Sequence, residues 1–311
     1  MNEQKVIDPV PGELILAELN ATTFLRKTNN GNNEIYVVNH RNAPNTLREI
    51  GRLREVTFRA AGGGTGLACD LDEYDTNEQP YQQLIVWNIT DKDIVGGYRY
   101  IHCKNAIGPN GEIMLATSEL FNFSEKFIRD YMPYTIELGR SFVQPKYQPT
   151  ATNRTGLFSL DNLWDGLGAI IVDNEDLKYY WGKVTMYLDF NRQARDMILY
   201  FMNYIFPDSE KLVTPIIPLK YETDIGAFAK EIEGLSYKEA HVILNHHVRS
   251  LKENIPPLVN SYMNISPTMK TFGTALNSHF GDVEETGILV TIADIYDSKK
   301  ERHVNTYQKK S

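Results

Sequence analysis

The chain has 311 residues, of which 42% are hydrophobic and 23% charged, and its formal net charge is −8. This composition is typical of a globular protein with one sizeable α/β domain. The negative charge argues against a nucleic-acid partner, because phosphate neutralisation needs clustered Lys and Arg. No apolar run reaches the roughly 18 to 20 residues of a membrane span, and the first residues lack a signal peptide's hydrophobic segment. We therefore expect a cytoplasmic protein.

The cysteines and histidines argue against a metal site. Cys69 and Cys103 are too few for a disulfide framework or a thiolate site, so we expect free thiols. His241, His246 and His247 share one predicted helix but lack the i, i+4 pair plus carboxylate of a zinc helix. We expect no bound metal.

The first hundred residues predict an N-terminal arm, a strand, a helix and a hairpin. The arm covers residues 1–34 and includes a polar Asn- and Gly-rich loop. A strand at 35–38 is followed by a helix that begins at Asn45 and ends before a glycine-rich loop at 62–66. The β-prone runs 84–89 and 94–101, joined by a short polar turn, predict a hairpin.

Strands and helices continue to alternate along the rest of the chain. Residues 134–143 predict a strand that Pro145 ends, and no Pro- or Gly-rich linker divides the sequence. We therefore expect residues 35–311 to form a single elaborated domain. The remaining predicted elements are helices at 160–172, 192–205 and 236–251 and strands at 181–188 and 287–295.

Charged residues occupy positions where a core would exclude them. Arg54 lies on the apolar side of its predicted helix, and Asp70, Asp72 and Asp75 follow the glycine-rich loop. Because an unpaired buried charge is costly, we expect Asp72 and Asp75 to hold Arg54 or Arg99 in a network that forms one wall of a site. The alternative is a set of surface carboxylates that cap a turn.

A second candidate lies on the predicted strand 134–143. Glu137 and Arg140 are three residues apart and would face opposite sides of a regular strand. Gly139 between them makes a β-bulge plausible, and a bulge would free a backbone N–H and bring both side chains to one side. The sequence therefore predicts a cleft with a carboxylate and an amide donor close together.

The order of these motifs resembles the acyl-homoserine-lactone synthases and the related N-acyltransferases that make ornithine and glycine lipids, within the GNAT superfamily. Segments 163–167 and 256–262 look closer to the amino-acid-lipid enzymes, some of which carry a haemolysin-like label. The resemblance implies an α/β fold with a mixed, splayed central sheet flanked by helices, an N-terminal arm and an extended C-terminal part. It is carried by Arg54, Phe58, Asp70, Asp72, Tyr74, Asp75, Gly96, Arg99, Glu137 and Arg140.

The resemblance also implies roles for individual residues. Glu137 would be the general base for the attacking amine. The backbone N–H groups of Phe142 and Val143 would stabilise the oxyanion of the thioester. The implied substrate-binding residues are Arg54, Phe58, Asp70, Asp72, Asp75, Arg99, Arg140, Ser141 and Trp164.

The implied co-substrate is a thioester, acyl carrier protein or acyl-CoA, with no tightly bound cofactor. The stretch after Val143 lacks the Arg/Gln-x-x-Gly-x-Gly/Ala loop that cradles coenzyme A, which favours the carrier protein. Lys146 with Arg154, or Arg192 with Arg195, could dock its acidic surface. Candidates for an apolar acyl slot are Leu115, Phe121, Phe123, Leu163, Trp164 and Met186.

The leading hypothesis is transfer of a long, 3-hydroxylated or unsubstituted acyl chain to the α-amine of a small amino acid such as glycine or ornithine. The product would be a lipid. The enzyme could therefore contact the inner face of the membrane peripherally, through the N-terminal arm near residues 14–19. Two alternatives stay open. One is an acyl-homoserine-lactone synthase that uses S-adenosylmethionine, and the other is a non-catalytic acyl- or lipid-binding protein of the same fold.

Overall fold

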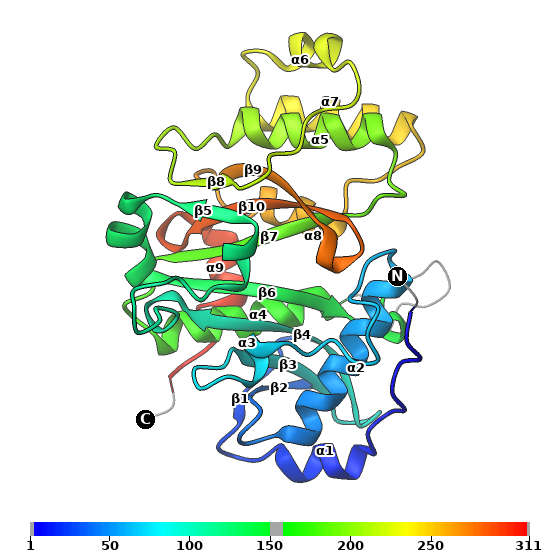
Figure 1. Cartoon of the computed structure of the whole chain (residues 1–311), viewed down its shortest axis with the longest axis vertical. Helices are drawn as coiled ribbons and strands as arrows, with labels where there is room; N and C mark the ends of the chain where they lie inside the picture. The colour runs from blue at the N-terminus through cyan, green and yellow to red at the C-terminus, as the bar shows by residue number, and fades with distance from the viewer. Residues whose placement is uncertain (1–2, 150–157, 310–311) are drawn as a thin grey trace. The chain divides into compact units, whose positions relative to one another are not determined.

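A computed structural model describes residues 3–149 and 158–309, and the chain divides into two compact units (Figure 1). Unit 1 contains the described residues of Met1–Ala116, Tyr134–Lys178 and Tyr296–Ser311, and unit 2 contains Thr117–Pro133 and Tyr179–Ile295. The fold is α/β, as expected. A single domain over residues 35–311 stays a prediction, because two compact units can belong to one folding domain.

Unit 1 is built on five strands, each antiparallel to its neighbour. The predicted hairpin and the strands at 35–38 and 134–143 are confirmed, whereas the first strand was not predicted. Only four residues long, it forms by pairing with the next strand rather than by a pattern of its own. In spatial order the strands are β1 (Phe24–Lys27), β2 (Asn33–Val38), β3 (Gln82–Asn88), β4 (Asp93–His102) and β6 (Thr135–Val143).

Helices α2 (Pro44–Ala60) and α4 (Ser159–Asp173), both predicted, lie on opposite faces of these strands. Successive side chains of a strand point to opposite faces. Gln83 of β3 accepts a hydrogen bond from α2, whereas the next residue, Leu84, lies against α4 at Gly166, where a Cβ atom would be 2.6 Å from Leu84. The face that carries Gln83 is therefore the face beneath α2.

The described part of the predicted arm, residues 3–34, contributes β1 and the short helix α1 (Gly12–Glu18) to unit 1. Glu18 accepts hydrogen bonds from the backbone N–H groups of Asn45 (3.0 Å) and Thr46 (2.8 Å). Those N–H groups start α2 and have no partner within the helix, so a distant carboxylate takes the place of a local cap. The arm thereby fixes the start of the helix that carries Arg54.

The remaining helices of unit 1 are α3 (Glu73–Thr76), between α2 and β3, and α9 (Asp297–His303), near the C-terminus. Helix α9 packs closely on α4, because a Cβ atom at Gly168 would lie 2.1 Å from the carbonyl oxygen of His303. The His303 imidazole and the Asp165 carboxylate, 2.7 Å apart, fasten the same pair of helices.

Unit 2 contains a three-stranded antiparallel run and a two-stranded ribbon. The predicted elements at 181–188, 192–205, 236–251 and 287–295 are confirmed, although the last strand begins at Val283 and ends at Thr291. The run comprises β7 (Tyr179–Met186), β10 (Val283–Thr291) and β9 (Lys270–Asn277), and the ribbon comprises β5 (Phe121–Phe123) and β8 (Val213–Pro215). The helices are α5 (Arg192–Ile205), α6 (Gly226–Ile232), α7 (Tyr237–Ser250) and α8 (Pro257–Met263).

Aromatic side chains gather around Trp181 in the core of unit 2. Phe121 and Phe272 lie edge-on to its indole, with ring centroids 5.7 and 5.4 Å away, and Phe123 does so at 5.6 Å. Two of the candidates for the acyl slot, Phe121 and Phe123, therefore pack against core residues. Among the described residues, no helix has the length and apolar character needed to cross a bilayer.

Candidate active site

Arg54 is fully buried on the side of α2 that faces the strands. Its Nη1 donates to both oxygens of Asp75, at 3.2 and 3.1 Å, and its Nη2 donates to Oε1 of Gln83. A buried guanidinium is stable only when carboxylate and amide oxygens replace its hydration. Of the two carboxylates expected to hold Arg54 or Arg99, Asp72 and Asp75, it is Asp75 that holds Arg54.

The two carboxylates of helix α3 also cap this helix. The Asp72 side chain accepts from the Asp75 N–H and the Asp75 side chain accepts from the Asp72 N–H, both at 3.2 Å. This reciprocal arrangement is a capping box, which an Asp-x-x-Asp spacing permits. Both alternatives from the sequence analysis are therefore present, because the carboxylates that cap the turn also accept hydrogen bonds from arginine side chains.

Arg99 of β4 joins the same carboxylates. Its Nη1 lies 2.7 Å from both oxygens of Asp72 and 3.3 Å from Oδ2 of Asp75. Burial by itself would raise the pKa of Asp75, but the charges of Arg54 and Arg99 outweigh burial and hold this pKa far below its ordinary value. Asp75 therefore stays ionised between two buried cations and joins α2, α3 and β4.

A β-bulge interrupts the pairing of β4 with β6, as the sequence predicted. Gly97 pairs with Phe142 and Arg99 pairs with Gly139, so β6 has two residues where β4 has one. The residue in the left-handed region is Arg140 (φ 47°) and not Gly139. Left-handed backbone is unfavourable for a residue with a Cβ atom, so tertiary contacts must hold Arg140 there.

Those contacts come from the acidic segment. Nε of Arg140 lies 3.0 Å from the Asp70 carboxylate, and its Nη2 lies 3.8 Å from Asp72. Arg140 therefore shares Asp72 with Arg99, which places both arginines on the same face of the strands. The bulge is what brings Arg140 to that face. We refer to Arg54, Asp70, Asp72, Asp75, Arg99 and Arg140 as the charged cluster.

Close approach of β4 and β6 requires glycine at position 96. A Cβ atom there would lie 2.3 Å from the carbonyl oxygen of Phe142. Gly96→Ala should lower the free energy of unfolding by about 1 to 3 kcal/mol, because the strands must separate to admit the methyl group. Urea unfolding measures this loss. Gly139→Ala is the matched control, since its Cβ would lie 3.7 Å from the nearest atoms, in Arg99. Equal losses in the two variants would contradict this explanation.

Glu137 is buried, with 1% of its surface exposed, and lies on β6 three residues before Arg140 of the bulge. The hydroxyl of Tyr81 donates to its Oε1 at 2.7 Å. The Tyr81 ring in turn lies beneath the Arg99 guanidinium, 5.1 Å from its Cζ atom. Tyr81 thus connects the predicted base to the charged cluster. Sequence reasoning missed Tyr81. The only available signal was its spacing of two residues from Gln83, which in an extended chain directs both side chains to the same side.

The backbone N–H groups of Phe142 and Val143 point in different directions. The Gln144 N–H donates to the carbonyl oxygen of Val95 across the β4–β6 pair, at 3.0 Å. Hydrogen-bonded and non-hydrogen-bonded positions alternate along antiparallel strands, and Gly97–Phe142 and Gly96–Val143 continue this register. The N–H of Phe142 therefore faces β4, whereas the N–H of Val143 faces away from it.

The structure does not bring every predicted site residue together. Phe58 is buried on α2 one turn after Arg54, and Ser141 lies in the bulge beside Arg140. Trp164, expected to bind substrate or to line the acyl slot, lies on α4, which covers the face opposite the charged cluster. The sequence predicts helices α2 and α4, but which face of the sheet each helix covers is known only once the register of the strands is known.

Two pairs of basic residues were predicted to dock an acyl carrier protein. Arg195 is fully buried beside Asp196 (2.9 Å), and Arg192 binds Glu284 (2.6 Å), so the pair Arg192 and Arg195 is not an open basic patch and this expectation is wrong. Both cations are neutralised within unit 2. Lys146 pairs with Asp91 and Asp93, at 3.4 and 3.1 Å. Its proposed companion, Arg154, lies outside the described residues.

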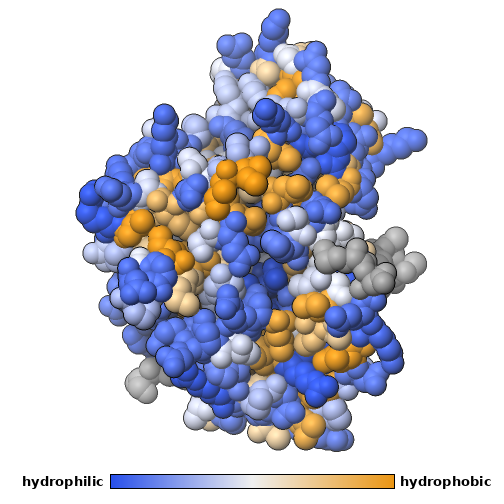
Figure 2. Space-filling model, in the orientation of Figure 1, coloured by the Kyte–Doolittle hydropathy of each residue, from blue (hydrophilic) through white to orange (hydrophobic). Residues whose placement is uncertain are grey.

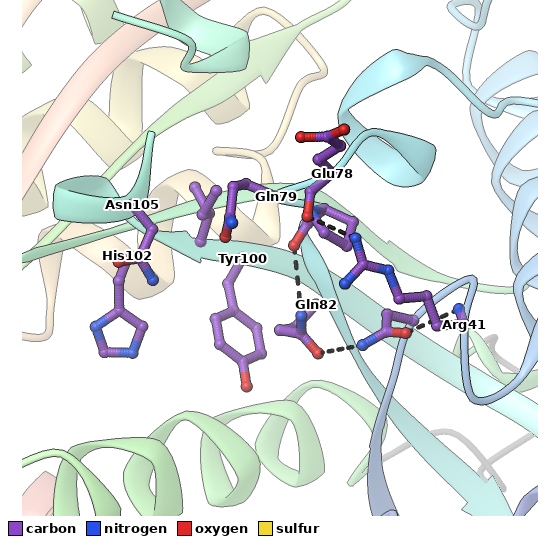
Figure 3. Close-up of a pocket in the computed structure, with 10 residues that line it drawn as sticks. Arg41, Glu78, Gln79, Gln82, Tyr100, His102 and Asn105 are labelled. Carbon is purple, nitrogen blue, oxygen red and sulfur yellow. Dashed lines mark hydrogen bonds between the residues drawn. The ribbon is translucent and has the colours of Figure 1, made fainter. Parts of the chain in front are cut away.

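Figure 3 shows a pocket of unit 1. Its volume is about 180 Å³. Gln82 and Tyr100 contribute to its lining, and strand alternation directs them away from the face that carries Gln83 and Arg99. Arg41 in this pocket donates to the backbone oxygen of Glu78 at 2.6 Å. We assign the pocket no part in the reaction. Among the described residues there is no group of three His, Cys, Asp or Glu side chains that could hold a metal ion.

Comparison with known proteins gives the family. Residues 53–155 match the acetyltransferase (GNAT) domain. A glycine N(alpha)-acyltransferase of Phocaeicola vulgatus is 53% identical over 311 residues, which cover 98% of this chain and 94% of that protein. This chain belongs to the glycine N(alpha)-acyltransferase family. A second member, from Bacteroides thetaiotaomicron, is 54% identical over 305 residues, which cover 98% of this chain and 90% of that protein.

The family relationship confirms the resemblance noted in the sequence. The protein is an N-acyltransferase with a GNAT-like fold, and the non-catalytic alternative is set aside. Membership of the glycine N(alpha)-acyltransferase family does not test the splay of the sheet or the assigned site residues, which stay predictions.

Two solved structures resemble the fold of this family member at low sequence identity. One is FeeM, an N-acyl amino acid synthase from uncultured soil microbes, with a TM-score of 0.41 and 8% identity, covering 92% of this chain and 98% of that one. The other is BjaI, a CoA-dependent acyl-homoserine lactone synthase, with a TM-score of 0.36 and 10% identity, covering 88% and 89%.

Proposed function

We propose that this N-acyltransferase moves a long acyl chain from a thioester to the α-amine of glycine. The observation that carries the proposal is the identity of 53 to 54% to two curated glycine N(alpha)-acyltransferases along nearly the whole chain. The buried Glu137 beside a cluster of arginines supports the same chemistry. Glycine therefore takes precedence over ornithine as the acceptor.

The reaction needs a base, because the α-ammonium of glycine cannot attack until it loses a proton. Glu137 accepts this proton, directly or through a water molecule. The freed amine then attacks the thioester carbonyl, and a carbon–nitrogen bond forms. The tetrahedral oxyanion is stabilised by the N–H of Val143, which faces away from β4. Collapse breaks the carbon–sulfur bond, the second proton of the attacking nitrogen passes to the sulfur, and a thiol and N-acylglycine are released.

Arg140 is the cation of the charged cluster best placed to meet the acceptor. About 15% of its side chain is exposed, whereas Arg54 and Arg99 are buried. A guanidinium binds a carboxylate through paired, charge-assisted hydrogen bonds. Arg140 would therefore orient the glycine carboxylate, and Asp70 and Asp72 would hold Arg140 in position.

The backbone after β6 favours acyl carrier protein over acyl-CoA. A 3₁₀ turn, Pro145–Tyr147, begins one residue after the strand ends, and Pro149 lies two residues beyond Tyr147. Proline has no N–H, so residues 145 and 149 cannot donate to a pyrophosphate. The phosphopantetheine of a carrier protein has no pyrophosphate, so a carrier-protein donor does not need a loop of backbone N–H groups to bind one.

The test combines two donors with three acceptors. Purified enzyme is mixed with acyl carrier protein or CoA thioesters of one chain length, and with glycine, ornithine or S-adenosylmethionine. Thiol release and mass spectrometry of the product are followed together. We expect N-acylglycine, formed faster from the carrier protein. Homoserine lactone as the product would support the signal-synthase alternative, and faster turnover of acyl-CoA would reverse the donor assignment.

Contact with a membrane would allow an acylated product to leave. Helix α1 exposes Leu14 (46%) and Leu16 (45%), and Figure 2 shows apolar side chains at the surface where Figure 1 places this helix. Replacing both leucines by Ser should reduce co-sedimentation with phospholipid vesicles at least several-fold, because buried apolar area drives such binding. Met114→Ser, an exposed apolar residue elsewhere in unit 1, is the control. Unchanged sedimentation of the double variant would contradict the contact.

A further inference from the structure

Tyr81 occupies a fixed position between the backbone and the carboxylate of Glu137. It is fully buried one residue before β3 begins. Its hydroxyl oxygen accepts the N–H of Ala116 at 2.9 Å and donates its own hydrogen to Oε1 of Glu137 at 2.7 Å. One interaction fixes where the oxygen lies, and the other directs its hydrogen. A phenol held in this way can present its proton in one direction only.

The ring of Tyr81 is held as firmly as its hydroxyl. Arg99 covers one face, with its Cζ atom 5.1 Å from the ring centroid, and Tyr74 lies edge-on at 5.8 Å. Arg99 is in turn bound to Asp72 and Asp75. The charged cluster thus supports Tyr81, and Tyr81 supports Glu137.

The phenol stays protonated across the physiological range. Burial raises the pKa of Tyr81 well above its ordinary value, and the neighbouring Glu137 carboxylate raises it further. Tyr81 is therefore a permanent hydrogen-bond donor and not an acid or base in the reaction. Such a donor favours the ionised form of a carboxylate.

We propose that Tyr81 is a positioning residue that orients the Glu137 carboxylate and keeps it ionised, so that it is ready to accept a proton. The inference rests on the proposed role of Glu137 as the base. It adds a specific consequence: the lowest pH at which the enzyme works depends on a residue that touches neither substrate. A role in packing alone would not affect that pH limit.

The test replaces the hydroxyl without changing the ring. Tyr81→Phe should lower kcat about 10- to 100-fold with little change in KM for glycine, because the carboxylate loses its donor. The acidic limb of the profile of kcat against pH should move to higher pH by about one unit, since a carboxylate without a hydrogen-bond donor is protonated more readily. Turnover is followed by thiol release between pH 5 and 9.

A second variant keeps the hydrogen bond and strengthens it. Site-specific incorporation of 3,5-difluorotyrosine at position 81 makes the phenol a better donor, so the acidic limb should move to lower pH. Opposite shifts in the two proteins would support the inference, because loosened packing cannot produce both. Thermal unfolding of each variant confirms that it is folded.

Tyr36→Phe is the matched control. The hydroxyl of Tyr36 donates to Glu34 at 2.6 Å on β2, outside the charged cluster, so the change removes a bond of the same kind. Its kcat and pH profile should match the wild type. A Tyr81→Phe protein with wild-type turnover, or one with reduced turnover and an unmoved acidic limb, would overturn the inference. Glu137→Gln tests the base separately, so failure of the Tyr81 inference can be distinguished from failure of the base assignment on which it rests.

Discussion

Replacing Glu137 by Gln should reduce kcat about 100-fold or more, with little effect on KM for the acyl donor. Glutamine has nearly the same shape and can still accept the hydrogen bond of Tyr81 at the position of Oε1. It cannot take a proton from the glycine ammonium. The loss should therefore appear in the chemical step, measured as thiol release at saturating glycine and donor.

A second buried glutamate provides the control for this substitution. Glu49 on α2 accepts hydrogen bonds from Arg52 and from the backbone of Val10 and lies outside the charged cluster. Glu49→Gln should leave kcat near the wild-type value, even if it lowers stability. Equal rates for wild type and Glu137→Gln would show that another group removes the proton, and would leave the acyl-transfer assignment itself intact.

Asp75→Asn should have the largest effect on stability, a loss of about 3 to 5 kcal/mol in the free energy of unfolding. Asp75 is the carboxylate shared by the buried Arg54 and Arg99. The neutral amide leaves two buried guanidinium groups without this negative charge. Urea unfolding, followed by circular dichroism, measures the difference from wild type.

The same pair of proteins gives a pH dependence with a definite sign. Because the folded protein lowers the pKa of Asp75, the carboxylate adds its full stabilisation above its ordinary pKa of about 3.9 and loses it as the pH falls further. The difference between wild type and Asp75→Asn should therefore be constant from pH 6 to 8 and shrink below about pH 4. Asp130→Asn, which affects the exposed pair with Arg129, should change nothing measurable. A pH-independent difference would contradict this explanation.

The secondary structure of the chain followed from its sequence wherever a pattern was long. Helix α5 has the predicted bounds, Arg192–Ile205, because apolar residues recur at helical spacing and Asn191 caps the first turn. Strand β1 and strand β9 were missed. Strand β1 has only four residues and β9 carries an internal glycine, Gly273, with positive φ, so neither shows the alternation on which prediction depends.

The charged cluster was predictable as a set of residues but not as a set of pairs. Arg54 lies on an apolar helix face and must pair with a carboxylate, because burying an unpaired guanidinium is too costly. This requirement does not depend on which fold the chain adopts. Which carboxylate it found depended on the register of the strands. Asp75 serves both Arg54 and Arg99, whereas Asp70 binds Arg140, seventy positions away.

Sequence by itself determined the family, the order of the motifs and the choice of Glu137 as the candidate carboxylate, because these depend on residue types and short spacings. Only the tertiary structure decided that Arg140 and not Gly139 takes the left-handed conformation, that Trp164 lies on the opposite sheet face, and that Tyr81 donates to Glu137. Each of these depends on how distant strands align. A shift of one residue in that alignment turns a side chain to the other face, and no local pattern in the sequence records it.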